Sequence, residues 1–380
     1  MSENKKDNGE IHFAKSENKK SKSHVQHNKK RIAFNIVGVF LSVVFILCGS
    51  GVLYVHGFLT RINYKELNIT SKPESSTETS KNNENSETSV PQPQLHVGDL
   101  LNDPMVLNII LFGADRRSTD EYGRTDTMML LSIDTRHEKL KMLSFQRDTY
   151  VAVPGYENNK LAHAYAFGGA ELAVQTIQNN YGIKIDRYAI VDFNSFTAII
   201  DTLGGIDIEL TDEEIDYINW QCWKNKQVET RHELTDTAGV VHLNGRQALW
   251  HARNRGEDGI CSGDDFTRTQ RQRAVMDILF NKMKNSSLTT ILNILYQIGP
   301  MITTNLKTSE ITGLAVDVMT YLNYDVESAS FPERSSLGTD YSFDDVPDMW
   351  GNTMNCIIIN DWYDFRRKVA VYIYEDAVIS

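Results

Sequence analysis

The chain has 380 residues, of which 41% are hydrophobic, and its formal net charge is -11 at pH 7. This apolar content is enough for a substantial core and excludes a wholly disordered protein, while the length allows one large domain or two modest ones.

The N-terminal part predicts a membrane anchor. The first thirty or so residues are rich in Lys, Asn, Ser and His and have little to bury, so we expect disorder. Residues 32–55 contain no charged side chain and are long enough to span a bilayer, and Lys29, Lys30 and Arg31 precede them. The positive-inside rule then keeps the N-terminus in the cytoplasm. A cleaved signal peptide is the alternative, but the residues after Val55 make a poor cleavage site.

The predicted organisation follows from these changes in composition. Residues 68–96 are mostly Ser, Thr, Asn, Glu and Pro, which is typical of a flexible spacer. We therefore expect a basic, disordered cytoplasmic tail over 1–31, a transmembrane helix over 32–55, a flexible extracytoplasmic linker over 56–100 and a catalytic domain over 101–380. The protein is thus expected at the cell membrane, with a single helix in the bilayer.

The rest of the chain alternates between strand and helix patterns. Apolar runs predict strands over 106–113, 128–133, 140–145, 206–210 and 356–359. Helical periodicity predicts helices over 162–181, 193–203, 266–284, 288–298 and 362–374. This alternation indicates an α/β fold, an α/β/α sandwich with a central mixed sheet.

The stretch from His251 to Arg273 is unusually rich in arginine for an acidic protein. It contains Arg253, Arg255, Arg268, Arg271 and Arg273. Guanidinium groups present planar forks of donors, so several of them together suit a phosphate or pyrophosphate.

The local geometry of this stretch can also be predicted. If the residues before Gly256 are extended, alternation places His251, Arg253 and Arg255 on one face of a strand. A helix should begin near Phe266, capped by Asp264 or Asp265. Asp265, Arg268 and Gln272 would then share one face of that helix.

Two other predicted strands end in arginine and aspartate. The strand ending at Gly113 leads into Asp115 and Arg117, and Arg124 and Asp126 open the next one. Arg147 and Asp148 follow the strand that ends at Phe145. Ligands of open α/β sheets bind beyond the carboxyl ends of the strands, so these side chains are expected at one edge.

The acidic pair at this edge has the chemistry of a metal site. Asp115 and Asp126 suit Mg2+, which binds carboxylate and phosphate oxygens. The chain has neither a Walker A sequence nor GxGxxG, so nucleotide hydrolysis and dinucleotide redox chemistry have no support. No cysteine and histidine spacing predicts zinc, and Cys222 and Cys261 could instead form a disulfide.

Several motifs together resemble the LytR-CpsA-Psr family of bacterial cell-envelope phosphotransferases. They are GADRRSTDEYGRTDTMML, SFQRDTYVAVPG, HLNGRQALWHARNR and DDFTRTQRQR, in this order along the chain. The resemblance implies an enzyme that moves a glycan phosphate from a polyprenyl-pyrophosphate carrier to peptidoglycan, typically to the C6 hydroxyl of muramic acid. The product would be attached wall teichoic acid or capsular polysaccharide, and polyprenyl phosphate would be released. Nucleic acid is not among the expected partners.

The resemblance also implies roles for individual residues. Asp115 and Asp126 match the family's Mg2+ ligands, with Mn2+ as the alternative ion. The residues that match its pyrophosphate-binding positions are Arg117, Arg124, Arg147, Arg253, Arg255, Arg268 and Gln272. Asp265 matches a carboxylate that acts as a base, and the catalytic set is expected to be Arg147, Arg253, Arg255 and Asp265. Many members have proline where this chain has Gln146.

The resemblance further implies an apolar tunnel for the lipid tail. Its candidate lining residues are Phe193, Phe196, Ile199, Ile200 and Leu203, or Ile278, Leu279 and Met283, although such stripes also occur in ordinary cores. Two other functions stay open. One is a non-catalytic regulator or scaffold that binds lipid-linked wall precursors, and the other is a polyprenyl-pyrophosphate hydrolase.

Overall fold

The computed structural model describes residues 57, 62–67, 91–115, 124–225, 233–256, 259–348 and 352–375. The chain separates into two compact units, Met1–Gly57 and Phe58–Ser380, and the description below concerns the second. The predicted cytoplasmic tail and transmembrane helix lie outside the described residues. Among the helices that are described, none is long and apolar enough to cross a bilayer.

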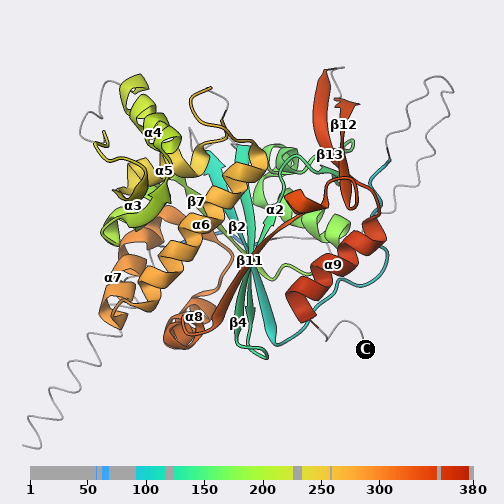
Figure 1. The fold of residues 1–380 in the computed structure, drawn as a ribbon. Helices are drawn as coiled ribbons and strands as arrows, with labels where there is room; N and C mark the ends of the chain where they lie inside the picture. Colours follow the sequence, from blue (N-terminus) through green and yellow to red (C-terminus); the bar gives the residue numbers. More distant parts are fainter. Residues whose placement is uncertain are drawn as a thin grey trace, which may run out of the picture. The chain divides into compact units, whose positions relative to one another are not determined.

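A seven-stranded mixed sheet forms the centre of this unit, with the order β1-β10-β7-β2-β3-β4-β11 (Figure 1). Its strands are β1 (Asn63–Tyr64), β2 (Val106–Asp115), β3 (Arg124–Asp134), β4 (Lys139–Phe145), β7 (Arg187–Asp192), β10 (Ile302–Thr304) and β11 (Asp325–Phe331). β2 pairs parallel with β7, whereas β3 runs antiparallel to both β2 and β4. The C-terminal ends of β2, β4 and β7 and the start of β3 therefore share one edge of the sheet.

Helices cover both faces of the sheet. On one face, buried side chains such as Ile110 and Phe112 pack with α2 (Leu161–Tyr181) and α9 (Trp362–Tyr374). On the other, Ile109 and Ile133 form a cluster with residues of α6 (Asp265–Lys284) and α8 (Thr308–Tyr321). Neighbouring residues of β2 thus point into different layers, as the alternation of a strand requires. The predicted α/β fold with a central mixed sheet is confirmed.

A second buried cluster lies beside the main sheet. It joins α3 (Phe193–Thr202), β8 (Ile206–Leu210), α4 (Asp212–Lys224), β9 (Gly239–Leu243), α5 (Gly245–Arg253) and the middle of α6. The predicted strand 206–210 is present, but it pairs with β9 in a separate two-stranded sheet. The remaining elements are β5 (Tyr150–Val151), β6 (Asn159–Lys160), α7 (Leu288–Ile298), η2 (Gly299–Met301), η3 (Arg334–Ser336), β12 (Tyr341–Pro347) and β13 (Thr353–Ile359).

The predicted strand before Gly256 is wrong, because these residues form helix α5. The Asn244 side chain accepts the amides of Arg246 and Gln247, and the Gln247 side chain accepts the amide of Asn244. This capping box satisfies donors that a helix start leaves unpaired. Arg253 is consequently the last helical residue, and Arg255 lies beyond the C-cap instead of on a shared strand face.

Part of the predicted linker is also structured. Asn63 and Tyr64 of β1 pair with Thr303 and Thr304 of β10, and Tyr188 donates a hydrogen bond from its hydroxyl to the Lys65 carbonyl. These residues fall within 56–100, so at least this short piece contributes to the sheet.

Candidate active site

A β-bulge presents Asp126 at the sheet edge described above. Gly113 pairs with Thr127 and Ala114 pairs with Thr125, so Asp126 is the extra residue of β3. Such a bulge re-aims a side chain, here at the point where β2 ends. Gly113 suits this place because an added Cβ would lie 2.9 Å from Thr127 Cβ.

Arg147 reaches Asp126 from the end of β4. Arg147 Nη1 lies 2.5 Å from Asp126 Oδ1, and Arg147 Nε lies 3.2 Å from Asp265 Oδ1. The loop that holds it is fixed by its backbone, since Gln146 N donates to Phe331 O at 3.3 Å and Ala162 N donates to Arg147 O at 3.0 Å. Proline has no amide hydrogen and could not donate the bond to Phe331 O. The glutamine at 146 adds this bond to the loop that holds Arg147.

The first turns of α6 supply Asp265 and Arg268. Asp264 caps the helix by accepting from Thr267 N at 2.9 Å, as predicted from the sequence. One turn apart, Arg268 Nη2 and Asp265 Oδ1 lie at 2.7 Å, and Arg268 Nη1 is 3.6 Å from Asp126 Oδ1. Arg268 is only 3% exposed, and its buried Nε has no hydrogen-bond partner among the described residues.

The C-terminal end of α5 completes the arrangement. Arg255 Nη1 lies 3.8 Å from Asp265 Oδ1. The guanidinium carbon of Arg253 stands 4.2 Å from the centre of the Phe193 ring, at the start of α3. Gln272 Nε2 donates to Ala252 O at 3.4 Å, which links α6 to α5.

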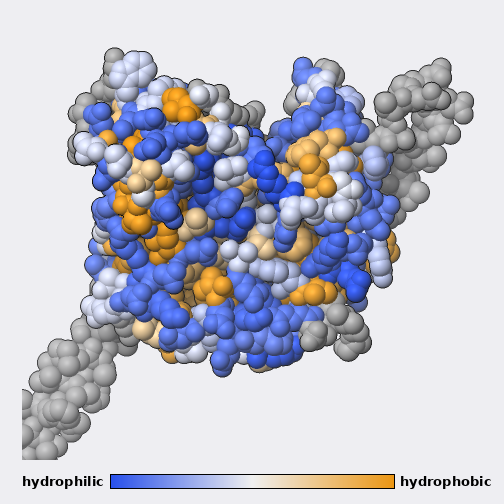
Figure 2. Space-filling model, viewed as in Figure 1, coloured by the Kyte–Doolittle hydropathy of each residue, from blue (hydrophilic) through white to orange (hydrophobic). Residues whose placement is uncertain are grey.

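We call Asp126, Arg147, Arg255, Asp265 and Arg268 the Arg–Asp cluster. It combines three guanidinium groups with two carboxylates that lie within 4 Å of them. Asp148 Oδ2 also lies 3.7 Å from Arg147 Nε, but Lys160 pairs with Asp148 at 2.9 Å, so one positive charge stays in excess. Figure 2 shows a strongly hydrophilic surface around the upper ends of α5 and α6, with apolar patches over α3 and α7 beside it. The cluster is therefore suited to a polyanion that has an apolar part.

Burial changes the ionisation of two members of the cluster. It raises the pKa of Asp265 above its ordinary value, and the guanidiniums of Arg268 and Arg147 offset this only in part. It also lowers the pKa of Arg268, although Asp265 and Asp126 act in the opposite direction. A carboxylate with a raised pKa is a stronger base, which makes Asp265 the cluster's best proton acceptor.

Three predicted site residues are only partly described or not described. Asp115 and Arg124 face each other in the β2–β3 pairing, which brings their backbones to the same edge as Asp126. Their side chains and the whole of Arg117 lie outside the described residues.

One group of side chains in the described part of the chain has metal-ligand chemistry, but it lies elsewhere. Ligand atoms of Asp134, His137 and Glu375 all fall within 4.8 Å of one another. Asp134 ends β3, opposite to the end that carries Asp126. The ammonium of buried Lys141 is 3.4 Å from Asp134 Oδ2 and 2.9 Å from Glu375 Oε1. Lys139 also pairs with Glu375 at 2.7 Å, so two ammonium groups neutralise the two carboxylates and the group is better described as an ion-pair network.

Two other predictions concern buried groups. Cys222 and Cys261 are each 5% exposed and lie in the same cluster, but in the thiol form, so the structure does not contain the disulfide. Ile200 and Leu279, two of the tunnel candidates, are buried in that cluster, while Phe196, Leu203 and Ile278 pack against it half-buried. Phe193 was expected only as a tunnel residue, and its contact with Arg253 could not be predicted because the two are 60 positions apart.

Comparison with known proteins finds relatives of this chain. The model of the LytR_cpsA_psr family matches residues 63–352. A relative from Bacillus mycoides, named polyisoprenyl-teichoic acid–peptidoglycan teichoic acid transferase TagU, is 31% identical over 281 residues, which cover 73% of this chain and 80% of the relative. A protein of the same name from Bacillus anthracis is 33% identical over 217 residues; the match covers 57% of this chain but only 65% of that relative.

Solved structures share the fold. The structure titled TagT bound to LI-WTA superposes with a TM-score of 0.54 at 23% identity, covering 71% of this chain and 91% of that one. The protein YwtF (TagT) with bound octaprenyl pyrophosphate lipid gives a TM-score of 0.51 at 22% identity, covering 73% and 99%. The family model matches residues 63–352, and the match to the Bacillus mycoides relative covers 80% of that relative. This chain is therefore a member of the LytR_cpsA_psr family.

Proposed function

We propose that this protein is a membrane-anchored teichoic acid transferase, or a transferase of a related glycopolymer. It moves a glycan phosphate from a polyprenyl-pyrophosphate carrier to peptidoglycan. The Arg–Asp cluster is the main support for this proposal, because arginines from the segments after β4 and α5 and from α6 converge on two carboxylates. The relatives named TagU and the TagT structure with a bound octaprenyl pyrophosphate support the choice of substrates.

The arginines bind the pyrophosphate of the donor. Arg147, Arg255 and Arg268 lie within one site. The Nε of Arg268 has no hydrogen-bond partner in the described part of the chain and is a further donor available to a phosphate oxygen. Arg253 and Gln272 extend this surface, and Arg117 and Arg124 are proposed to join from the loop after β2. Preorganised cations of this kind stabilise charge that develops on a transferred phosphoryl group.

Asp265 acts as the general base for the acceptor. Its carboxylate takes the proton of the acceptor hydroxyl while the hydroxyl oxygen attacks the phosphorus that carries the glycan. The bond from this phosphorus to the bridging oxygen breaks, and polyprenyl phosphate leaves with that oxygen. Arg147 and Arg268 contact Asp265 and are placed to neutralise the leaving phosphate.

The carboxylates fit a magnesium ion in their chemistry. Asp126 offers hard oxygen ligands from the bulge of β3, and Asp115 ends the neighbouring strand. We propose that these two residues hold Mg2+, or alternatively Mn2+. When bound, the ion supplies further neutralisation of charge on the phosphate oxygens.

The membrane anchor belongs to the same proposal. Residues 32–55 form the transmembrane helix, 1–31 the cytoplasmic tail, 56–100 the linker to the outside and 101–380 the catalytic domain, with β1 as a structured piece within the linker. This arrangement brings the reaction to the outer face of the cell membrane, where lipid carrier and peptidoglycan are both present.

The proposal is tested by reconstituting the reaction. The full-length chain in detergent micelles is incubated with a polyprenyl-pyrophosphate-linked glycan, Mg2+ and peptidoglycan, and both products are measured. We expect glycan covalently joined to peptidoglycan and an equal amount of polyprenyl phosphate, and no transfer after chelation with EDTA. Binding of the donor without cleavage would instead identify a scaffold. Release of polyprenyl phosphate with no glycan on peptidoglycan would identify a hydrolase.

A further inference from the structure

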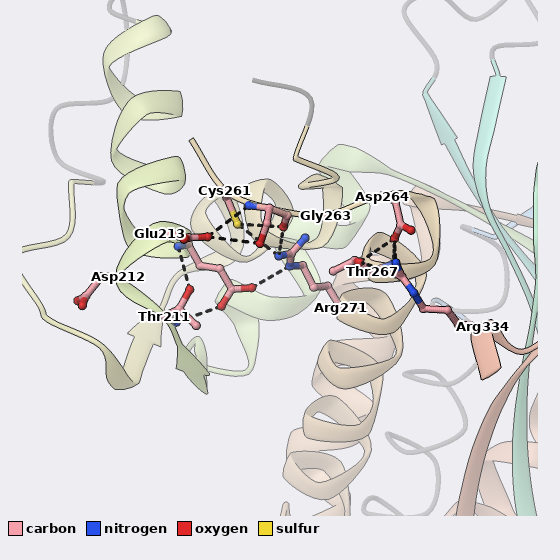
Figure 3. Close-up of a pocket in the computed structure, with 11 residues that line it drawn as sticks. Thr211, Asp212, Glu213, Cys261, Gly263, Asp264, Thr267, Arg271 and Arg334 are labelled. Carbon is pink, nitrogen blue, oxygen red and sulfur yellow. Dashed lines mark hydrogen bonds and ion pairs between the residues drawn. The ribbon is translucent and has the colours of Figure 1, made fainter. Parts of the chain in front are cut away.

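A polar cleft lies beside the Arg–Asp cluster, between the N-terminal ends of α4 and α6 (Figure 3). Its volume is about 760 Å³, within the usual range for ligand sites. The residues that line it are Thr211, Asp212, Glu213, Glu214, Cys261, Ser262, Gly263, Asp264, Thr267, Arg271 and Arg334.

Arg271 forms polar interactions with several of the segments that make up the walls of this cleft. This side chain is 8% exposed, and its Nε lies 2.8 Å from Glu214 Oε1 of α4. Its Nη1 donates to Asn254 O at 2.8 Å, and its Nη2 donates to Cys261 Sγ at 3.4 Å. The cleft is therefore a built feature that joins α4, the end of α5, the 261–264 loop and α6.

The cleft and the Arg–Asp cluster occupy different faces of one helix end. Asp264 and Thr267 line the cleft, whereas Asp265 and Arg268 belong to the cluster. At about 100° per residue, Thr267 and Arg271 project from one side of α6, and Asp265 and Arg268 project from the adjacent side. Asp265 directly follows Asp264, which lines the cleft, so the cleft and the cluster meet at the N-terminal end of α6.

The charge of the cleft differs from that of the cluster. Three carboxylates, those of Glu213, Glu214 and Asp264, lie on the same side as two guanidiniums, those of Arg271 and Arg334, which gives a formal excess of one negative charge. The Asp212 carboxylate points away from them and accepts the Ala238 amide at 2.8 Å (Figure 3). This excess disfavours a pyrophosphate. Carboxylates and the hydroxyls of Thr211, Ser262 and Thr267 instead suit a ligand rich in hydroxyl and amide donors.

We propose that this cleft is the acceptor subsite, which binds the amino-sugar backbone of peptidoglycan and presents a hydroxyl to Asp265. This inference rests on the proposed function and deepens it. In this arrangement the donor approaches through the arginines and the acceptor approaches over the N-terminus of α6, so the two substrates meet at Asp265 from different sides.

The test uses the full-length chain and soluble peptidoglycan fragments. The variant Glu213→Gln removes one exposed charge at nearly constant shape. We expect KM for the fragments to rise about tenfold, as the loss of one charge-assisted hydrogen bond would produce. The kcat value and the Kd for a polyprenyl pyrophosphate should stay near wild type. Glu209→Gln, an equal change of charge on the exposed side of β8, is the matched control and should alter none of these values.

Two further measurements keep the outcome decisive. Ser262→Trp, at an exposed lining position, should block the cleft and reproduce the rise in KM. Calorimetry measures the Kd for the fragments without donor, and so independently of turnover. This Kd should rise in both variants. Wild-type KM and wild-type fragment binding in the variants would overturn the acceptor subsite alone. A wild-type chain that binds fragments and donor but transfers nothing would overturn the proposed function.

Discussion

Replacement of Arg268 by lysine separates the geometry of the guanidinium from its charge. In the structure this one side chain spans two carboxylates, with Nη2 at 2.7 Å from Asp265 Oδ1 and Nη1 at 3.6 Å from Asp126 Oδ1. Its Nε offers a third donor. Lysine keeps the positive charge but has a single nitrogen, which cannot serve both carboxylates and a phosphate at once.

The expected loss follows from the number of interactions removed. Losing one hydrogen bond to a charged group costs roughly 1.5–3 kcal/mol. At about 1.4 kcal/mol for each factor of ten, kcat/KM for Arg268→Lys should fall roughly 10- to 150-fold. The fold should persist, because the half-buried carboxylates of Asp126 and Asp265 keep a cationic partner.

The assay is steady-state transfer to peptidoglycan, together with thermal unfolding of each variant. Arg367→Lys, an exposed arginine of α9, is the control and should match wild type in both measurements. If Arg268→Lys transferred glycan at a rate within twofold of wild type, the bridging geometry would have no role in the reaction, and the reasoning would be refuted.

Four further predictions concern the same region. Because burial raises the pKa of Asp265 above 3.8, transfer should fall as pH drops through that raised pKa, and Asp265→Asn should lose transfer while it retains donor binding. The raised pKa also means that stability is lost as pH rises through it, so Asp265→Asn should unfold at a higher temperature than wild type at pH 7; a lower Tm would contradict this. Phe193→Leu removes the ring that stacks on Arg253 at 4.2 Å, so the Kd for a polyprenyl pyrophosphate should rise roughly 2- to 30-fold, from a cation–π term of about 0.5–2 kcal/mol, while Phe193→Tyr should bind normally. Gly113→Ala should lower the unfolding free energy by about 1–3 kcal/mol, since the new Cβ would crowd Thr127, and an unchanged denaturant midpoint would argue against the close approach.

The parts of the fold with strong local patterns could be predicted from the sequence. β2 is a continuous apolar run, because both of its faces are buried, and α9 has the periodicity of an amphipathic helix. β11 is different, since its sequence DVESASF is largely polar and only its end is buried. Its pairing with β4 depends on contacts distant in sequence, which a local pattern does not contain.

The error at α5 has an identifiable cause. The apolar residues Ala248, Leu249 and Trp250 suggested a strand leading to the arginines, and all three are buried in the helix. Asn244 followed three positions later by Gln247 is a capping-box signal that favours a helix start, and it could have corrected the prediction.

The candidate site was predictable in composition but not in detail. Arginines and aspartates at strand ends indicated where Asp126 and Arg147 would meet, because β3 begins at the sheet edge where its antiparallel neighbour β4 ends. The contact of Arg253 with Phe193 and the polar cleft behind α6 both depend on how α3, α4 and α5 pack, and sequence spacing carries no information on this packing.

In the proposed reaction, the ion pairs around Asp265 would impose an order on the two substrates. Its carboxylate forms ion pairs with Arg147, Arg255 and Arg268, and these are the groups that would bind an incoming pyrophosphate. Once the arginines turn to the phosphates, the carboxylate loses its stabilising cations and its affinity for a proton increases further. Binding of the lipid carrier would thereby make Asp265 a stronger base. An acceptor hydroxyl that binds before the carrier would meet a carboxylate that is still paired with the arginines.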